Sequence, residues 1–260
     1  MTAATWVRPP LRRGVRRWLQ GYGAMLRWET TNMRLLLPVT ALAQILSGGG
    51  LVLGFGLLYQ DMPVRAAQFL STGAVVVTLV LVGLVLGPQL IAQQKAAGIY
   101  DFMWSLPVPR TAAAAAWTTL NLFIAVPGML AALLVAMWRY DLTFSFQIQL
   151  VPAAAPTLLT ATLLGYALAH AIPKPELTQL ASQVLVFAIL GFSPISFPAE
   201  NLPSWLARVH EYLPFESMAN VIRSALLPDL ALDASRSYVV LGVWAVIGAA
   251  VSMLTLGRRR

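Results

Sequence analysis

The chain has 260 residues, of which 58% are hydrophobic and only 11% are charged. A soluble domain normally carries roughly 25% charged residues, so these charges are too few to coat a water-facing surface of this size. The mean hydropathy of +0.71 agrees. We therefore expect lipid, rather than water, to surround most of the molecule.

Cysteine is absent, which excludes disulfides, thiolate metal sites and cysteine nucleophiles. The formal net charge is +8. The basic residues cluster at the edges of apolar segments, which is typical of the cytoplasmic ends of a membrane protein and not of a nucleic-acid-binding surface. We therefore expect membrane lipid as a partner, and no nucleic acid.

Six stretches are long enough to cross a bilayer, because a spanning helix needs about 20 mainly apolar residues. They are Leu35–Tyr59, Phe69–Ile91, Ala112–Trp138, Leu150–Ile172, Leu177–Ile195 and Tyr238–Leu256. None holds Asp, Glu, Lys or Arg in its interior. The predicted fold is an all-α polytopic membrane protein. Residues 1–34 form a basic tail and an interfacial helix, and residues 35–260 form a single six-helix transmembrane domain.

The positions of lysine and arginine predict the orientation. With the N-terminus in the cytoplasm, 13 of the 18 Lys and Arg residues lie inside and 5 lie outside, as the positive-inside rule requires. Six spans then place both termini inside. The basic start resembles a signal peptide, but the apolar run that begins near residue 35 is too long and further spans follow it. A retained signal-anchor fits better.

Residues 1–14 are basic and contain Pro9 and Pro10, so we expect a loose tail. In Val15–Arg34, one helical face carries Trp18, Tyr22, Met25 and Leu26. Much of the rest carries Arg16, Arg17, Gln20, Arg27 and Arg34. This pattern predicts an amphipathic helix along the cytoplasmic interface, with its arginines towards anionic lipid. The alternative is a short soluble helix packed on a partner.

Two pairs of glycines are spaced by four residues within the predicted spans. Gly50 and Gly54 lie in the first span, and Gly83 and Gly87 in the second. Such small residues allow helices to approach closely in lipid. We expect both pairs at packed helix contacts.

The segment between residues 93 and 110 lies in the cytoplasm by the charge rule. Ile99, Phe102, Met103 and Leu106 share one helical face, and Pro107 and Pro109 then end the helix. The apolar face of a cytoplasmic helix must be shielded from water. The cover is either the membrane surface or a partner protein.

The external segment Ser196–Arg236 is too interrupted by prolines to span the membrane. Its first apolar stripe consists of Trp205, Leu206, Val209 and Leu213. Its second consists of Met218, Val221, Ile222, Ala225 and Leu226. We expect two short helices that dip into the outer leaflet.

The chain lacks the motifs of several kinds of chemistry. It has no G-x-x-x-x-G-K-[ST] phosphate loop, no H-E-x-x-H and no G-x-S-x-G. Its two histidines, His170 and His210, lack Cys or carboxylate neighbours at ligand spacing. Ion-coupled transporters place ionisable residues inside the membrane, and these spans have none. If the protein moves a substrate against its concentration gradient, we expect the energy to enter from outside the bilayer, through the segment at 93–110.

Two local motifs in this order resemble the ABC-2 type transporter permeases, a family of membrane subunits of ATP-driven exporters. The first motif resembles the family's coupling helix and contains Gly98, Ile99, Tyr100, Asp101, Phe102, Met103, Leu106, Pro107 and Arg110. The second resembles the family's proline-rich outer segment and contains Pro194, Pro198, Pro203, Trp205, Leu206, Pro214 and Arg223. The resemblance covers nearly the whole chain. One departure is that Gln93, Gln94 and Lys95 stand where family members often carry acidic residues.

The resemblance implies a mechanism and partners. Two permease subunits, identical or paralogous, each bind one ATP-binding cassette ATPase through the coupling helix. ATP and Mg²⁺ are held by that ATPase, and this chain binds no cofactor and is not an enzyme. The passage lies between the permeases, lined by the first, second and fifth spans. The substrate is an amphipathic, lipid-like, drug or glycan-type molecule, exported across a bacterial plasma membrane.

Two other classes of function remain open at this point. A membrane enzyme acting on lipid needs a polar cluster at one membrane face, and Asp101 with Lys95 is the one candidate pair. A passive channel or an assembly scaffold needs no such cluster. Activity without an ATPase favours the enzyme, and currents without ATP favour the channel.

Overall fold

The computed structural model describes residues 14–257, apart from residues 60, 100–101, 104–105, 146–147 and 231–233. Within these residues every regular element is a helix. The elements are α1 (Val15–Met33), α2 (Leu37–Leu58), α3 (Val64–Leu81), the π-helical turn η1 (Val82–Leu86), α4 (Gly87–Ala96), α6 (Arg110–Tyr140), α7 (Leu150–Ala171), α8 (Pro175–Phe192), η2 (Ala199–Asn201), α9 (Ser204–His210), α10 (Pro214–Leu226), η3 (Pro228–Leu230) and α11 (Ala234–Gly257). The predicted all-α fold class is confirmed.

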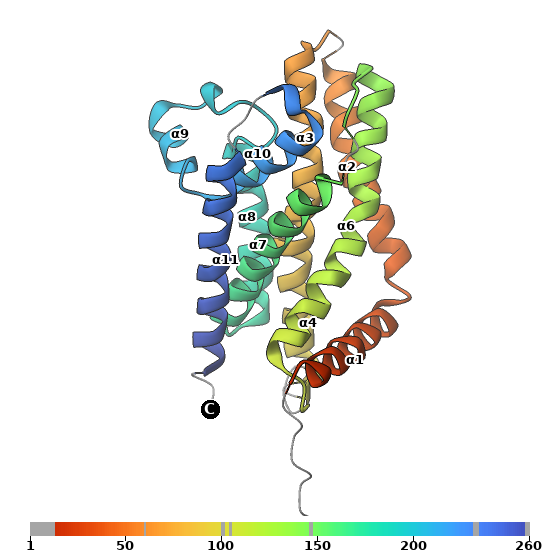
Figure 1. Ribbon diagram of the computed structural model, residues 1–260, viewed down its shortest axis with the longest axis vertical. Helices are drawn as coiled ribbons and strands as arrows, with labels where there is room; N and C mark the ends of the chain where they lie inside the picture. Colours follow the sequence, from red (N-terminus) through yellow and green to blue (C-terminus); the bar gives the residue numbers. More distant parts are fainter. Residues whose placement is uncertain are drawn as a thin grey trace, which may run out of the picture.

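Six helical stretches in the described part of the chain are long and apolar enough to cross a membrane, as predicted. They are α2, the continuous stretch α3–η1–α4, α6, α7, α8 and α11. The six run roughly side by side, and α1 lies across one end of the bundle (Figure 1). The α9 segment lies towards the other end. We refer to these as the α1 end and the α9 end.

The boundaries differ from the expected ones in two instructive places. The second span is a helical stretch of 33 residues, Val64–Ala96, and so is about 50 Å long, whereas the hydrocarbon core is about 30 Å thick. The apolar pattern marks only its middle. The fifth span ends at Phe192 and not at Ile195. Ser193 is extended, with φ −92° and ψ 139°, because a residue before a proline disfavours the helical conformation.

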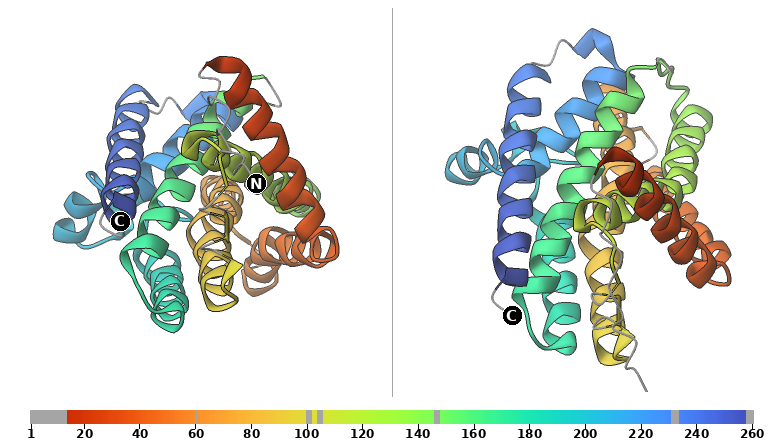
Figure 2. Two further views of the ribbon diagram at one scale, coloured as in Figure 1. Left: turned by 90° about the horizontal axis from the view of Figure 1, so that it is seen from below. Right: turned by 60° about the horizontal axis from the view of Figure 1, so that its bottom comes forward.

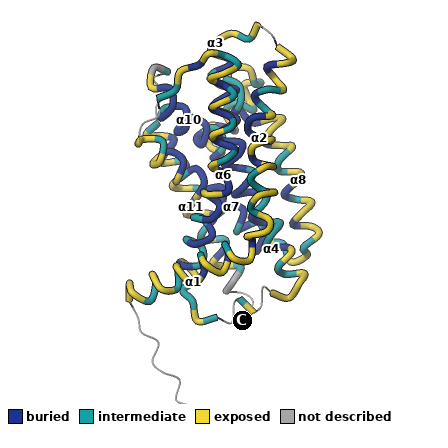
Figure 3. Tube along the Cα trace, turned by 90° about the vertical axis from the view of Figure 1, so that its right-hand side faces the viewer, coloured by how far each residue is buried: buried dark blue, intermediate teal, exposed yellow. Residues whose placement is uncertain are grey.

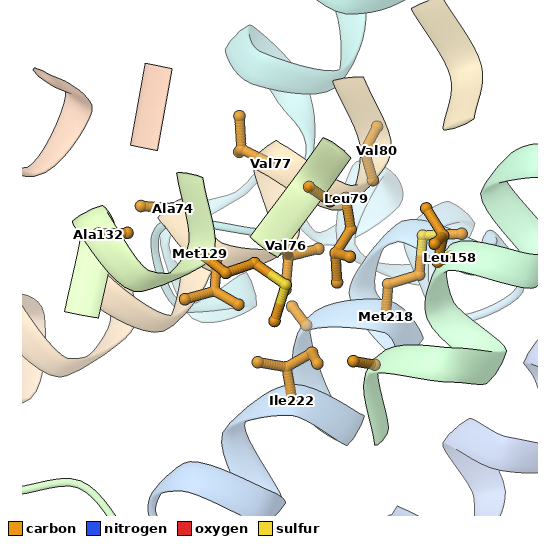
Figure 4. Close-up of a cluster of buried hydrophobic side chains, with 14 of the residues drawn as sticks. Ala74, Val76, Val77, Leu79, Val80, Met129, Ala132, Leu158, Met218 and Ile222 are labelled. Atoms are coloured by element: carbon orange, nitrogen blue, oxygen red, sulfur yellow. The ribbon is translucent and has the colours of Figure 1, made fainter. Parts of the chain in front are cut away.

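The stretch α3–η1–α4 forms the centre of the bundle. It contacts α2, α6, α7, α8 and α10. Figure 3 shows α3 buried at the centre, while α1 and α8 are largely exposed. Side chains of four helices meet in the core, where Val76 and Leu79 of α3 lie among Met129 of α6, Leu158 of α7 and Ile222 of α10 (Figure 4).

Glycines permit the closest helix crossings in this core. A Cβ added to Gly48 of α2 would collide with the carbonyl oxygen of Gly128 in α6, and would lie 3.0 Å from the Thr78 methyl of α3. A Cβ on Gly83 would collide with the α7 backbone at Ala161. The expectation that Gly83 lies at a packed helix contact is therefore confirmed. Gly50 and Gly54 have nothing within 4 Å of their Cβ positions, so the expectation was wrong for this pair within the chain.

We predict that Gly48→Ala destabilises the protein and that Gly50→Ala does not. The added methyl at residue 48 forces α2 away from α6, at a cost of about 1–3 kcal/mol, whereas the methyl at residue 50 enters open space. The readout is the thermal unfolding midpoint of each purified variant in detergent. Equal midpoints for the two variants would show that the α2–α6 crossing is looser than described.

Candidate functional site

The segment between α4 and α6 leaves the bundle at the α1 end through a left-handed glycine. Gly98 has φ +71°, a conformation that favours glycine. Beyond it, Ile99 is 37% exposed and Phe102 is 54% exposed. The other predicted coupling residues that are described vary in exposure: Met103 and Leu106 are half-buried, and Pro107 and Arg110 are exposed. The predicted Asp101 lies outside the described residues.

Helix α1 holds this segment in place through side-chain hydrogen bonds. Arg17 donates to the carbonyl oxygen of Pro107 at 3.1 Å. The Trp18 indole donates to Thr111 Oγ1, and the Tyr22 hydroxyl donates to Thr119 Oγ1, each at 3.0 Å. The aromatic face expected from the sequence therefore covers the first turns of α6. Two of the predicted arginines, Arg16 and Arg27, are exposed.

The backbone of α1 also approaches the segment directly. A Cβ on Gly21 would lie 3.0 Å from Pro109 Cδ and 3.2 Å from Val108 Cγ1, so any larger residue would press on these two side chains. Further along α1, the rings of Trp28 and Phe102 lie 6.4 Å apart. A shallow groove runs between them, lined by Trp28, Asn32, Ala97, Gly98, Ile99 and Phe102. This groove is the apolar surface that the segment presents outward.

A second feature at the α1 end is a partly open cavity of about 700 Å³ between the helices. Its wall is formed by residues of α1, α4, α6, α7 and α11 together with the segment before α6. Most of the lining is apolar. The ionisable groups in the lining are Glu29, Arg110, Tyr166 and His170. His170 Nδ1 lies 2.6 Å from the Tyr166 carbonyl oxygen, and its ring stacks on that of Tyr166, which agrees with the expected packed histidine.

Glu29 is the most unusual residue of this cavity. It is only 4% exposed, and no hydrogen bond or ion pair engages it within the described part of the chain. Burial raises its pKa to about 7, and no neighbouring charge contributes to this shift. Glu29 was not among the predicted site residues, although its spacing gave a signal: Tyr22, Met25 and Glu29 fall on one helical face, which places a carboxylate within the apolar stripe.

At the α9 end, a buried arginine ties the outer segment to the core. Arg223 of α10 is 1% exposed. It donates to the carbonyl oxygen of Ile195, and its Nε lies 3.3 Å from Thr72 Oγ1. Its guanidinium lies 4.2 Å from the ring centre of Phe69. Burial lowers the pKa of Arg223 to about 9, although the negative charge of Glu216 raises it. The guanidinium therefore stays charged at neutral pH.

The backbone of α3 packs directly on the same turn. A Cβ on Gly73 would lie 2.5 Å from the Ile195 carbonyl oxygen and 2.6 Å from Ser196 Cα. Arg223 and Gly73 therefore fix the chain where α8 ends. The remaining predicted outer residues are buried at Pro194 and Pro214, half-buried at Pro198 and Leu206, and exposed at Pro203 and Trp205.

The two apolar stripes of the outer segment have different surroundings. The stripe of α10 is fully buried at Met218, Val221 and Ile222, and α10 contacts α3, α7 and α11. Protein, and not lipid, therefore covers this stripe. The stripe of α9 remains open, since Trp205 is 66% and Val209 47% exposed.

Lys95 completes the α1 end of the bundle. Its ammonium donates to the carbonyl oxygens of Ala169 and Ile172, the latter at 3.2 Å. A cation at the C-terminus of α7 satisfies carbonyls that the helix leaves open and interacts favourably with its dipole. Lys95, which the sequence offered with Asp101 as a candidate polar pair, is therefore bound by backbone carbonyls of α7 and the residue after it. No group of three or more metal-binding side chains occurs among the described residues.

The sequence profile of the ABC-2 family transporter proteins matches residues 58–254. The chain belongs to the ABC-2 transporter family. No curated protein is significantly similar to the chain. Family membership makes it the membrane-spanning permease subunit of an ABC transporter, confirming the resemblance seen in the sequence. The ABC-2 family works with a separate ATP-binding cassette ATPase that handles ATP, and the permease holds no cofactor of its own.

We predict that the pH dependence of stability of this ABC-2 permease reports on Glu29. Its pKa is raised in the folded state from 4.5 to about 7, so the folded chain holds a proton that the unfolded chain releases. Stability is then lost as pH rises from about 4.5 to 7. Glu29→Gln mimics the protonated form. At pH 8 it should stabilise the protein by on the order of 1–3 kcal/mol, and at pH 4.5 it should have little effect.

Thermal unfolding of the two proteins at pH 4.5 and pH 8 measures this difference. Glu200→Gln is the control, because that carboxylate is 80% exposed and forms only a long surface ion pair with Arg65, at 3.9 Å. A Glu29→Gln variant that gains no stability at pH 8 would mean that the carboxylate is solvated.

We further predict that Arg223→Gln loosens the turn at residues 193–198. The change removes a buried charged donor and its contact with Phe69, at a cost of about 2–4 kcal/mol. Amide hydrogen exchange of this turn, followed by mass spectrometry, should accelerate. Arg236→Gln is the control, because Arg236 forms an exposed ion pair with Glu211 at 3.2 Å, and it should leave the exchange unchanged.

Proposed function

We propose that this permease is half of an ATP-driven exporter in a bacterial plasma membrane, with both termini in the cytoplasm. Its substrate is an amphipathic, lipid-like, drug or glycan-type molecule. The observation that carries the proposal is the exposed apolar segment at the α1 end, in a family whose partner is an ATPase. The spans themselves hold no Asp, Glu, Lys or Arg in their apolar interiors, so coupling to an ion gradient has no titratable group to use there.

The distribution of basic residues supports this orientation. The α1 end carries Arg16, Arg17, Arg27, Arg34, Lys95, Arg110 and Lys174. The α9 end carries Arg65, Arg139, Arg208, Arg223 and Arg236. Positive charge near the ends of spans favours the cytoplasmic side, so the α1 end faces the cytoplasm. Helix α1 then lies along the inner membrane surface, with Arg16 and Arg27 free to meet anionic headgroups.

The groove beside Phe102 is the proposed docking surface for the ATPase. Ile99 and Phe102 present apolar side chains outward, while the segment behind them is bonded to α1 through Pro107 and joined directly to α4 and α6. A push on this surface therefore acts on the ends of the second and third spans. Because α3–η1–α4 is one continuous helix, the displacement reaches the Arg223 contacts at the opposite end.

A second permease subunit, identical or paralogous, is the other proposed partner. Figure 2 shows α2 and α8 on either side of the α3–α4 helix. Both carry rows of exposed apolar side chains, such as Leu42 and Leu46 on α2 and Val184 and Phe187 on α8. A passage between two such subunits would be lined by the first, second and fifth spans and would suit an amphipathic substrate.

We predict that Ile99→Asp combined with Phe102→Asp abolishes binding of the ATPase. Two carboxylates in the centre of an apolar contact leave charges buried without partners, and such changes typically cost several kcal/mol of binding. The readout is the amount of ATP-binding cassette subunit that co-purifies with the tagged full-length permease from its native host. This subunit is identified by the phosphate-loop motif in its sequence. The yield and monodispersity of the permease should be unchanged.

Thr31→Asp is the matched control, because Thr31 is exposed at the same end but lies outside the groove lining. It should retain the ATPase. Full retention of the ATPase by the double variant would mean that docking occurs elsewhere on the chain.

A further inference from the structure

The cavity at the α1 end is larger and longer than a packing defect. Its volume of about 700 Å³ falls within the range of about 300–1,000 Å³ that is usual for small-molecule sites. Along α7 its lining extends from Ala155 to His170, and a helix rises about 22 Å over this distance. The cavity is therefore elongated along the bundle axis.

The two ends of the cavity differ in chemistry. Near the α1 end the lining includes Glu29, Gln94, Arg110 and His170. Further into the bundle the lining from α6 and α7 is Leu122, Ala155, Leu158 and Leu159, and Thr118, Thr119 and Leu163 lie between the two ends. One end is therefore polar and ionisable, and the other is purely aliphatic. An occupant that matches both ends has a polar head and an apolar tail about as long as a lipid chain.

The sign of the head follows from Glu29. This carboxylate lines the cavity, is 4% exposed and has no hydrogen-bond or ion-pair partner among the described residues. An unpaired buried carboxylate is costly, and burial is the sole cause of its raised pKa. The one cation in the lining, Arg110, is exposed and adds nothing to that shift. A cationic head beside Glu29 would supply the missing charge.

We propose that this cavity is a binding site, within a single chain, for an amphiphile with a cationic amine or ammonium head that pairs with Glu29 and an alkyl tail that lies between α6, α7 and α11. The site goes beyond the transport function proposed above. The residues that line this cavity are different from those that line the groove proposed for the ATPase. Its failure would therefore leave the exporter assignment untouched, and loss of ATPase docking would leave this site intact.

The test measures binding to the full-length chain, without ATPase, in nanodiscs of digalactosyldiacylglycerol, a bilayer lipid whose head carries no amine or ammonium group. The probe is dodecyltrimethylammonium, held below its micelle concentration. The matched control is dodecyldimethylamine oxide, which has the same tail and a similar head without net charge at pH 8. Equilibrium dialysis against empty nanodiscs subtracts simple partitioning into lipid.

At pH 8 we expect saturable binding of one ammonium probe per chain, weakened about tenfold or more by Glu29→Gln. A factor of ten corresponds to about 1.4 kcal/mol. The amine oxide should bind both proteins alike. Glu200→Gln, at the opposite end, should bind the ammonium probe as the wild type does. Equal affinity of the wild type and Glu29→Gln for the ammonium probe would overturn the proposal.

The pH profile gives a second readout. Glu29 is ionised above pH 7 and protonated below it, so the affinity of the wild type for the ammonium probe should fall about tenfold between pH 8 and pH 5.5. The other titratable groups in the cavity are Arg110 of α6 with Tyr166 and His170 of α7. If one of these governed binding, Glu29→Gln would keep the pH dependence. A flat profile in Glu29→Gln supports the proposal, and a retained profile contradicts it.

Two further measurements complete the test. Ala114→Phe fills the cavity from the α6 wall and leaves every charged residue in place, so it should abolish binding of the ammonium probe. Unchanged binding would contradict the proposed location. Replacing a third of the galactolipid with phosphatidylethanolamine then distinguishes the source of the amine. Competition with the probe identifies a lipid amine as an occupant, and its absence identifies a soluble amphipathic cation. Binding that persists in Ala114→Phe in both lipid mixtures is adventitious.

Discussion

The continuous helix formed by α3, η1 and α4 is the constraint on which the rest of the structure depends. It runs for 33 residues from one end of the bundle to the other, and five other helices pack on it. One of its ends leads through Gly98 into the apolar segment beside α1. Its other end holds Phe69 and Thr72 against Arg223. A single continuous helical stretch therefore connects the proposed docking surface with the outer segment.

Close helix crossings join this element to its neighbours. The crossings at Gly48 with Gly128 and at Gly83 with Ala161 leave no room for a Cβ. Packed helices in such contact slide or tilt together, because a close-packed crossing has no void that could absorb a shift. The π-helical turn Val82–Leu86 lies at the second crossing, where an altered helical register gives the long helix its one internal irregularity. Turns of this kind often occur at functional positions.

Much of the architecture could be predicted from the sequence, because a lipid environment imposes simple rules. Length and hydropathy gave six spans, and the resemblance gave the family. The rules failed where protein replaces lipid as the cover. The stripe of α10 looks like a membrane-surface helix, yet α3, α7 and α11 cover it. Its pattern of apolar residues is the same in both cases, so the pattern alone does not distinguish them. Glu29 was not predicted because its place on the apolar face of α1 does not by itself show that protein covers this carboxylate; the structure shows that it is 4% exposed.

The most direct test of the central claim is the accessibility of residue 102 in the assembled transporter. The chain has no cysteine, so Phe102→Cys introduces a single reactive thiol. A water-soluble maleimide should label this thiol rapidly in the isolated permease and at least tenfold more slowly once the ATPase is bound. Thr31→Cys should react at the same rate in both states. Equal labelling of residue 102 with and without bound ATPase would contradict the claim that the driving force enters through this segment.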